Sequence, residues 1–204
     1  MKEQTSLGFS TVSSLFVLYN NLPVTMTERE IFDSQKYDTF HGVSYVASPK
    51  FFADMVKDFQ KVVFIIGIPD SDVSNSFAQG LENILMQPEG GIEFFNQLPV
   101  AAKTRVADDA MQIRYGKAGV MIHDKIYLLS NAATGEYRTI IGSANMSLSA
   151  FGQENRNFEN IRIDDGQELY QNRRKTPSFS YGDIRRRNLL AVSNNFSTKF
   201  HERY

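Results

Sequence analysis

Apolar and polar positions alternate over a stretch near the middle of the chain. From Val120 to Leu129, one set of alternate residues is apolar and the other set includes His123 and Lys125. A period of two is typical of a β-strand, so both side chains are expected on the same side of one strand. The chemistry of Asn131–Gly135 favours a turn, and Tyr137–Ile141 then has the pattern of a returning strand. The alternation therefore predicts a β-hairpin in this half of the chain.

This hairpin would gather several polar side chains. With the turn centred near the middle of its segment, the returning strand brings Gly142 about level with His123. Ser143 and Asn145 then arrive beside the imidazole and the Lys125 ammonium, so a base or nucleophile, a cation and two neutral donors converge. A lone His on a strand is more often a packed or surface residue, and a Gly-Ser turn is common before a helix. It is the combination of order and spacing that favours a site for a phosphate oxyanion.

Other stretches alternate between strand and helix patterns. Strand patterns occupy Leu15–Tyr19, Val43–Ala47, Val62–Ile66, Ile92–Phe95, Met111–Tyr115 and Phe158–Ile163. Helix patterns follow the capping residues Thr27 and Ser48 and cover Val73–Leu85, Ala101–Val106, Met146–Phe151 and the polar, basic stretch after Gln167. Strands and helices in alternation, followed by a hairpin, predict an α/β domain with a mixed β-sheet flanked by helices on both faces. We expect Met111–Tyr115 to pair beside the hairpin.

Composition narrows the class of protein. The 204 residues suffice for one domain with a sizeable core, and there is no cysteine, which excludes disulfides and cysteine-based zinc sites. The three histidines lack metal-ligand spacing, so we predict no metal site and no cofactor. No segment resembles a signal peptide, and none approaches the roughly 20 apolar residues of a membrane span. A cytoplasmic protein without a membrane partner is the expectation.

Charge is informative through its distribution, since the net charge is only −1. Two basic runs lie near the C-terminal end of the sequence. They comprise Arg173, Arg174, Lys175, Arg185, Arg186 and Arg187. Such runs are either solvated faces or surfaces that contact phosphates, and both alternatives stay open. If they do bind DNA, they would hold its phosphates without reading its sequence.

The order of these residues resembles the phospholipase D superfamily. Its mark is His-x-Lys, a strand, a turn and Gly-Ser-x-Asn, with a Glu in the next strand. The matching residues here are His123, Lys125, Gly142, Ser143, Asn145 and Glu159. The motif's usual Asp, five residues after the Lys, is replaced by Ser130. By the alternation above, Ser130 is expected beyond the strand, away from His123, where it would replace a structural contact and not a catalyst.

The resemblance implies a phospholipase D-like fold and a role for each matching residue. His123 would attack phosphorus and form a phosphohistidine, or serve as the general acid that completes the reaction. Lys125 would neutralise the non-bridging oxygens, while Ser143 and Asn145 would donate hydrogen bonds to them. Glu159 would accept the proton on the other ring nitrogen of His123; its alternative is a surface pair with a nearby Arg. The helix after Asn145 would add N–H donors.

One His-x-Lys motif supplies half of what this chemistry needs. His41 is followed by Gly-Val and His201 by Glu-Arg, so neither completes a second motif. Single-motif members of the superfamily dimerise, which implies a homodimer with the active site at its two-fold axis.

Short single-motif members are mostly nucleases, including metal-independent restriction endonucleases. The resemblance therefore implies a metal-independent phosphodiesterase acting on DNA, with residues 1–176 as the catalytic domain. Residues 177–204 would be a C-terminal extension or the start of a linker to a DNA-reading domain. A non-catalytic structural or nucleic-acid-binding module and a lipid phosphodiesterase are the alternatives. An exposed apolar rim beside the site would favour lipid, and an electropositive groove would favour nucleic acid.

Overall fold

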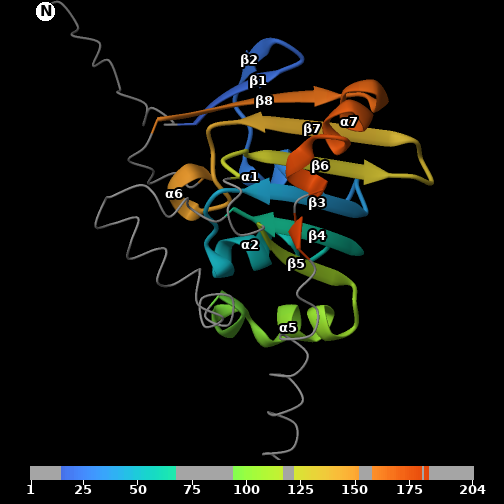
Figure 1. Ribbon diagram of the computed structural model, residues 1–204. Helices are drawn as coiled ribbons and strands as arrows, with labels where there is room; N and C mark the ends of the chain where they lie inside the picture. Colours follow the sequence, from blue (N-terminus) through green and yellow to red (C-terminus); the bar gives the residue numbers. More distant parts are fainter. Residues whose placement is uncertain (1–14, 68–93, 117–121, 152–157, 181, 184–204) are drawn as a thin grey trace, which may run out of the picture.

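One mixed β-sheet organises the described part of the chain (Figure 1). The computed structural model describes residues 15–67, 94–116, 122–151, 158–180 and 182–183. Within them, nine strands follow the order β2-β1-β8-β7-β6-β3-β4-β5-β9. The strands are β1 (Leu15–Tyr19), β2 (Leu22–Val24), β3 (Thr39–Ser44), β4 (Lys61–Ile66), β5 (Met111–Gly116), β6 (Ile126–Asn131), β7 (Glu136–Gly142), β8 (Glu159–Asp165) and β9 (Gly182–Asp183). The prediction of an α/β protein with a mixed sheet is confirmed.

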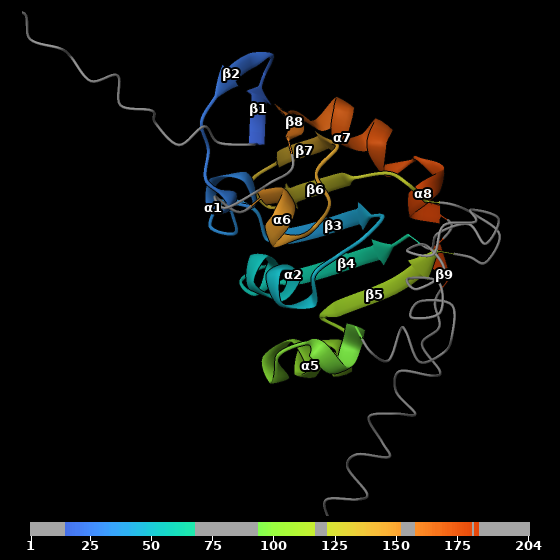
Figure 2. The same cartoon turned by 90° about the vertical axis from the view of Figure 1, so that its left-hand side faces the viewer.

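Helices cover the sheet on both faces (Figure 2). They are α1 (Glu28–Ile31), α2 (Pro49–Val56), α5 (Val100–Ala107), α6 (Leu148–Phe151), α7 (Gln167–Arg174) and α8 (Pro177–Ser180). Alternate residues of β6 enter two different cores. Tyr127 and Leu129 join the larger core, which includes α2 and α6, whereas Ile126 and Leu128 join a smaller core with Tyr170 of α7 and Phe179 of α8. The period of two thus decides which layer each side chain supports.

The central hairpin is confirmed, but its neighbours differ from the prediction. Strands β6 and β7 pair antiparallel, and β6 also pairs antiparallel with β3. Strands β3, β4 and β5 are mutually parallel, with α2 as the crossover between β3 and β4. The expectation that Met111–Tyr115 pairs beside the hairpin is wrong, because β3 and β4 lie between β5 and β6.

Local sequence signals account for the helix starts. Thr27 caps α1 through a reciprocal pair of bonds: the N–H of Glu30 donates to the Thr27 hydroxyl, and the N–H of Thr27 donates to the Glu30 carboxylate. Helix α2 begins with Pro49 after Ser48, as predicted. The face that carries Phe52 is buried, and its ring stacks on Phe64 with centroids 4.4 Å apart. Both helix starts follow from short-range chemistry.

Two strand predictions are wrong, one in its bounds and the other in the type of element. Val43–Ala47 was expected as a strand, but β3 ends at Ser44, because the Ser44 carbonyl already accepts a hydrogen bond from Gly67 where the chain turns away. Within Ile92–Phe95, the described residues belong to a helical segment at 94–97. Short apolar runs have the same composition in buried helices and strands, which explains the error. The predicted helix Val73–Leu85 lies outside the described residues.

The residues after α7 continue to pack on the sheet. The basic helix predicted after Gln167 is confirmed as α7. Phe179 of α8 is 6% exposed, and β9 pairs antiparallel with β5. The domain boundary at residues 176 and 177 stays a prediction, and 184–204, including Arg185, Arg186 and Arg187, lie outside the described residues.

Candidate functional site

His123 lies in a loop, residues 122–125, that leads into β6. The predicted strand from Val120 is therefore wrong at its N-terminal end, because β6 begins at Ile126. The pairing of Asn131 with Glu136 centres the turn between residues 133 and 134. As a result, the N–H of Gly142 donates to the Lys125 carbonyl at 3.4 Å, and Gly142 is level with Lys125 and not with His123.

Two glycines allow the backbone to approach closely around this loop. A Cβ on Gly67, at the end of β4, would lie 2.2 Å from the carbonyl oxygen of Ile122. A Cβ on Gly142 would lie 2.0 Å from the carbonyl oxygen of Asn160 in β8. Neither position tolerates a side chain without moving backbone. Gly67 thus places the residue before His123; sequence reasoning took it only as a strand end.

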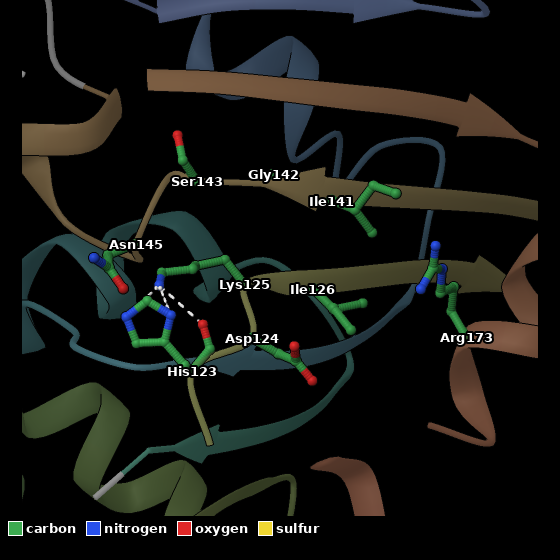
Figure 3. A pocket seen from close by; sticks show the side chains of 9 residues that line it. All are labelled: His123, Asp124, Lys125, Ile126, Ile141, Gly142, Ser143, Asn145 and Arg173. Carbon is green, nitrogen blue, oxygen red and sulfur yellow. Dashed lines mark hydrogen bonds between the residues drawn. The ribbon is translucent and has the colours of Figure 1, made fainter. Parts of the chain in front are cut away.

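The loop and the end of the hairpin border an open pocket of about 540 Å³ (Figure 3). Its lining combines four of the predicted site residues with a basic side chain from α7. The lining residues are His123, Asp124, Lys125, Ile126, Ile141, Gly142, Ser143, Asn145 and Arg173. Four of the five predicted catalytic residues, together with Arg173 from the predicted DNA-binding set, therefore line one cavity, and Glu159 does not.

Lys125 contacts the histidine directly. Its Nζ lies 3.2 Å from Nδ1 and 3.4 Å from Nε2 of His123, and it donates to the His123 carbonyl at 2.9 Å (Figure 3). The lysine is 9% exposed while the imidazole is exposed to the pocket. Among the described residues, Lys125 forms no ion pair. A buried ammonium without a counterion attracts an anion.

Burial also shifts the acid–base properties of this pair. The pKa of His123 is lowered by burial and then by the Lys125 charge, with Asp124 opposing. The pKa of Lys125 is lowered by burial, against the opposing effects of Glu159 and Asp124. A His pKa below its usual 6.5 keeps the imidazole neutral at neutral pH, so one ring nitrogen carries a lone pair, and the Lys125 ammonium lies within hydrogen-bond distance of the ring nitrogens. That is the protonation state of a nucleophile.

The Tyr45 ring contacts both His123 and Lys125. Its ring centroid lies 4.8 Å from that of His123, and Lys125 Nζ lies 5.6 Å from it in a cation–π contact. Sequence reasoning missed this residue, because nothing in its spacing connects it with His123. The contact arises from the packing of the segment after β3 beside the loop.

Asn145 is oriented by buried polar bonds at the end of β3. Its Oδ1 accepts from the N–H of Val46 at 3.3 Å. Ser44 Oγ accepts from the N–H of Met146 at 3.0 Å and donates to the Val46 carbonyl at 2.6 Å. With Oδ1 engaged by the backbone, the amide NH₂ is the group of Asn145 left to donate to a ligand, although in Figure 3 it is Oδ1 that lies on the side of His123.

Ser143 and Glu159 form a separate pair. The Ser143 hydroxyl donates to the Glu159 carboxylate, accepts from the N–H of Asn160 at 3.0 Å, and points away from His123 (Figure 3). The expectation that Glu159 accepts a proton from His123 is wrong in this structure. Strand β7 explains it, because it separates β8, which carries Glu159, from β6 and its preceding loop. Glu159 acts on Lys125 only through space.

Helix α8 fastens the site loop from the other side. The Ser178 hydroxyl donates to the carboxylate of Asp124, and Ser178 itself is buried. Next to it, the Arg174 guanidinium lies 5.4 Å from the centroid of Phe179. Ser178 is a residue that sequence reasoning missed, since 54 positions separate it from Asp124.

Ser130, the departure from the motif, lies inside β6 and not beyond it, so that expectation is wrong. The strand is longer at this end because Ser130 pairs with Thr39 and Tyr137. Its buried hydroxyl accepts from the Tyr170 hydroxyl at 3.1 Å. The residue therefore makes a structural contact with α7.

The basic run at the end of α7 divides among three environments. Arg173 borders the pocket on the side opposite His123 (Figure 3), Arg174 packs on Phe179, and Lys175 is exposed. His41 is buried in β3, where the Arg174 charge also reaches it. Burial, followed by the charges of Arg174, Lys61 and Arg114, lowers the pKa of His41 to about 3. It is a packed residue and takes no part in the pocket.

The described residues show neither a metal cluster nor a membrane-spanning helix. Within the described ranges, no group of three or more His, Cys, Asp or Glu residues is placed to hold a metal ion. No helix in that part of the chain is long and apolar enough to cross a membrane. The sequence matches no family model and no curated protein. The functional assignment therefore rests on the geometry of the pocket.

Proposed function

We propose that this protein is a metal-independent phosphodiesterase that hydrolyses DNA through a phosphohistidine at His123, as in the phospholipase D superfamily. The observation that carries the proposal is the Lys125 ammonium, which is buried, unpaired within the described residues, and 3.2 Å from a ring nitrogen of an exposed histidine. Two of its three donors face the His123 carbonyl and ring, so one remains for a phosphate oxygen. Asn145 and Arg173 add donors around the same pocket.

The chemistry proceeds in two displacements. A neutral ring nitrogen of His123 attacks phosphorus; an N–P bond forms, the P–O bond to the leaving nucleotide breaks, and that oxygen takes a proton from a general acid. Water then attacks phosphorus, and the N–P bond breaks. The proton that water loses passes to the group that acted as the general acid in the first step. Lys125 and Asn145 stabilise the negative oxygens in both transition states. The positive charge that a metal ion supplies in other nucleases comes here from Lys125.

The general acid would come from a second copy of the chain. No other histidine of the described residues lies at the pocket, since His41 is buried in β3 and does not line it. A homodimer with its two-fold axis at the pocket would place His123 of each copy across one phosphate. The exposed position of His123 suits this arrangement. Light scattering should show a dimer, and an active monomer at assay concentration would contradict the mechanism.

A second candidate is hydrolysis of a lipid phosphodiester, and one observation favours it. Large apolar side chains are exposed next to site residues in the sequence: Leu148 at 65% follows the Asn145 segment, and Phe158 at 88% precedes Glu159. An apolar rim beside a phosphate pocket suits a membrane surface as well as a second protein copy. Lys125 and Arg173, in contrast, give the pocket the positive charge that nucleic acid requires.

The deciding experiment offers both substrates to the full chain in millimolar EDTA. We expect nicking and cleavage of supercoiled plasmid, no release of headgroup from phosphatidylcholine vesicles, and loss of turnover in His123→Ala. Circular dichroism should show that this variant is folded, because the imidazole is exposed. Labelled substrate should leave an acid-labile phosphoryl adduct on the wild type and none on His123→Ala. A strict need for Mg²⁺, or full activity of folded His123→Ala, would overturn the proposal, and headgroup release without plasmid cleavage would establish the lipid candidate.

A further inference from the structure

On the sheet face that carries α7, an aromatic side chain of β1 is exposed. Helix α7 packs on β7 and β6. On β1, Leu15, Val17 and Tyr19 face the larger core, so Phe16 and Leu18 point to the opposite face. Phe16 is 53% exposed there. An aromatic ring presented to solvent in the middle of a strand is a candidate contact for a ligand.

A recess of about 480 Å³ is hollowed beside this ring. Its lining is partly apolar and partly planar and polar: Phe16, Leu18, Ile141, Gly142, Asn160, Ile161 and Arg162. Pairing across β1 and β8 sets Phe16 opposite Asn160 and Leu18 opposite Arg162. Arg162 in turn lies opposite Ile141 of β7. The recess is therefore built by neighbouring residues of three adjacent strands.

The recess and the pocket at His123 adjoin at the end of β7. Ile141 and Gly142 line both cavities, one on each side of the end of β7. A group bound in the recess would thus sit one strand away from a phosphate held by Lys125 and Asn145. In a nucleic acid, the group at that separation from a phosphate is the base of the adjoining nucleotide.

The chemistry of the lining distinguishes a base from an acyl chain. The Arg162 guanidinium is held by two bonds to the Asp164 carboxylate, at 2.7 and 2.9 Å, which fixes it as a flat plate. The Phe16 ring offers a second flat surface, and Asn160 offers an amide at the recess. Aromatic rings and guanidinium planes stack on bases, and amides bond base edges. An acyl chain can neither form hydrogen bonds with the amide nor stack on the guanidinium.

We propose that this recess binds one nucleobase next to the scissile phosphate, and that the enzyme therefore acts preferentially on single-stranded DNA. The inference rests on the proposed nuclease function. A base can enter the recess only when it is unpaired and unstacked from its neighbours, which duplex DNA resists. Phe16, Asn160 and Arg162 thus form a substrate-positioning site, whereas His123 and Lys125 carry the chemistry.

The test compares Phe16 variants on two oligonucleotides in EDTA. One is an ordinary labelled single strand, and the other has the bases flanking the cleaved bond replaced by abasic tetrahydrofuran sites. For the ordinary strand, Phe16→Ala should raise KM by roughly tenfold, as expected for one lost base stack, with little change in kcat. For the abasic strand, wild type and Phe16→Ala should have equal KM. Phe16→Tyr, which keeps the ring, should retain wild-type KM, while Phe16→Leu, which keeps the apolar bulk, should not.

Each result separates the two levels of the proposal. If the wild type cuts neither single-stranded nor plasmid DNA, the proposed function fails and the base site falls with it. If the wild type cuts DNA but Phe16→Ala has unchanged KM, or an equal loss on both oligonucleotides, the base site alone is overturned. A dimer that dissociates in Phe16→Ala would show that a second copy occupies the recess, which also overturns it. Faster wild-type cleavage of duplex than of single strand would contradict the inferred strand preference.

Discussion

Two buried cations near the central hairpin have opposite environments. Arg138 of β7 is 5% exposed, and its guanidinium makes bonds of 2.8 and 3.1 Å to Asp165 and donates to the carbonyls of Glu30 and Ile31. Lys125, at 9% exposed, has only the His123 carbonyl and ring as hydrogen-bond partners. The two cations are thus almost equally buried, but Arg138 has an ion-pair partner and Lys125 has none among the described residues.

The pKa shifts of the two cations follow the same contrast. Burial pulls the pKa of Arg138 down, but the Asp165 hydrogen bond and charge outweigh it, so the net shift is upward. Burial lowers the pKa of Lys125, and the distant carboxylates do not compensate. A charge that the fold fully pairs serves the fold; a charge that the fold leaves unpaired is available to a ligand. The comparison supports a structural role for Arg138 and agrees with the ligand-binding role proposed for Lys125.

Replacing Arg138 should cause the largest loss of stability. In Arg138→Met, Asp165 loses its bidentate partner while half-buried, and the free energy of unfolding should fall by about 3–5 kcal/mol. Urea denaturation measures it. The exposed pair of Arg29 and Asp54 supplies the control, since Arg29→Met should cost no more than about 1 kcal/mol. Equal losses in the two variants would refute the structural assignment of Arg138.

Removing Lys125 should have the opposite profile. Lys125→Met keeps the length of the side chain but deletes the charge, so the cleavage rate should fall roughly 10²-fold, as for a lost oxyanion donor. The free energy of unfolding should stay within about 1 kcal/mol of the wild type or rise, because a buried unpaired charge is gone. Lys50→Met, at an exposed position of α2, controls for loss of charge alone. A large destabilisation with an unchanged rate per folded molecule would reverse the comparison.

The contrast also shows which features were predictable from the sequence. Hairpin, helix starts and strands such as Val62–Ile66 follow from periodicity and capping, which act over a few residues. His123, Lys125 and Asn145 were found because their order and spacing are local. Arg138 was not singled out, because its partners lie on α1 and β8, far along the chain.

The errors in the site share one physical origin. Whether Glu159 meets His123 or Ser143 depends on strand order, and the level of Gly142 depends on a turn centred half a residue from the expected place. Gly67 and Ser178 act on the loop through contacts between segments that no short motif connects. A sequence pattern sets which residues converge but not which neighbour each one finally bonds.

Ser178 offers a smaller test of how the functional side is held. Ser178→Ala removes the hydroxyl that bonds Asp124, which frees the loop next to His123, and the rate should fall severalfold. The loss should appear in kcat more than in KM, and Ser178→Thr should restore much of it. Ser180→Ala, on the exposed side of the same helix, should behave as the wild type. Equal rates for Ser178→Ala and Ser180→Ala would show that α8 does not position the loop.

The smallest expected effect is a shift in the pKa of His123 itself. In the wild type its pKa lies below 6.5 because burial and the Lys125 charge both disfavour the imidazolium. Lys125→Met removes the second cause, so the pKa of His123 should rise, and the imidazole should become protonated at a higher pH than in the wild type. NMR titration of the ring protons in both proteins measures the change. A pKa that is unchanged or lower in Lys125→Met would show that the two groups are not electrostatically coupled.

The parallel pairing of β1 with β8 has a consequence for how the protein becomes active during synthesis. Strand β1 is made early, but Leu15 pairs with Glu159, so its main partner emerges from the ribosome more than a hundred residues later. Until then β1 has only the short strand β2, and an isolated two-stranded ribbon is marginally stable in water. Closing so long a loop is entropically costly and slow. Phe16 is therefore set in place among the last parts of the sheet, so the recess that it lines forms only after the loop at residues 122–125 has been translated.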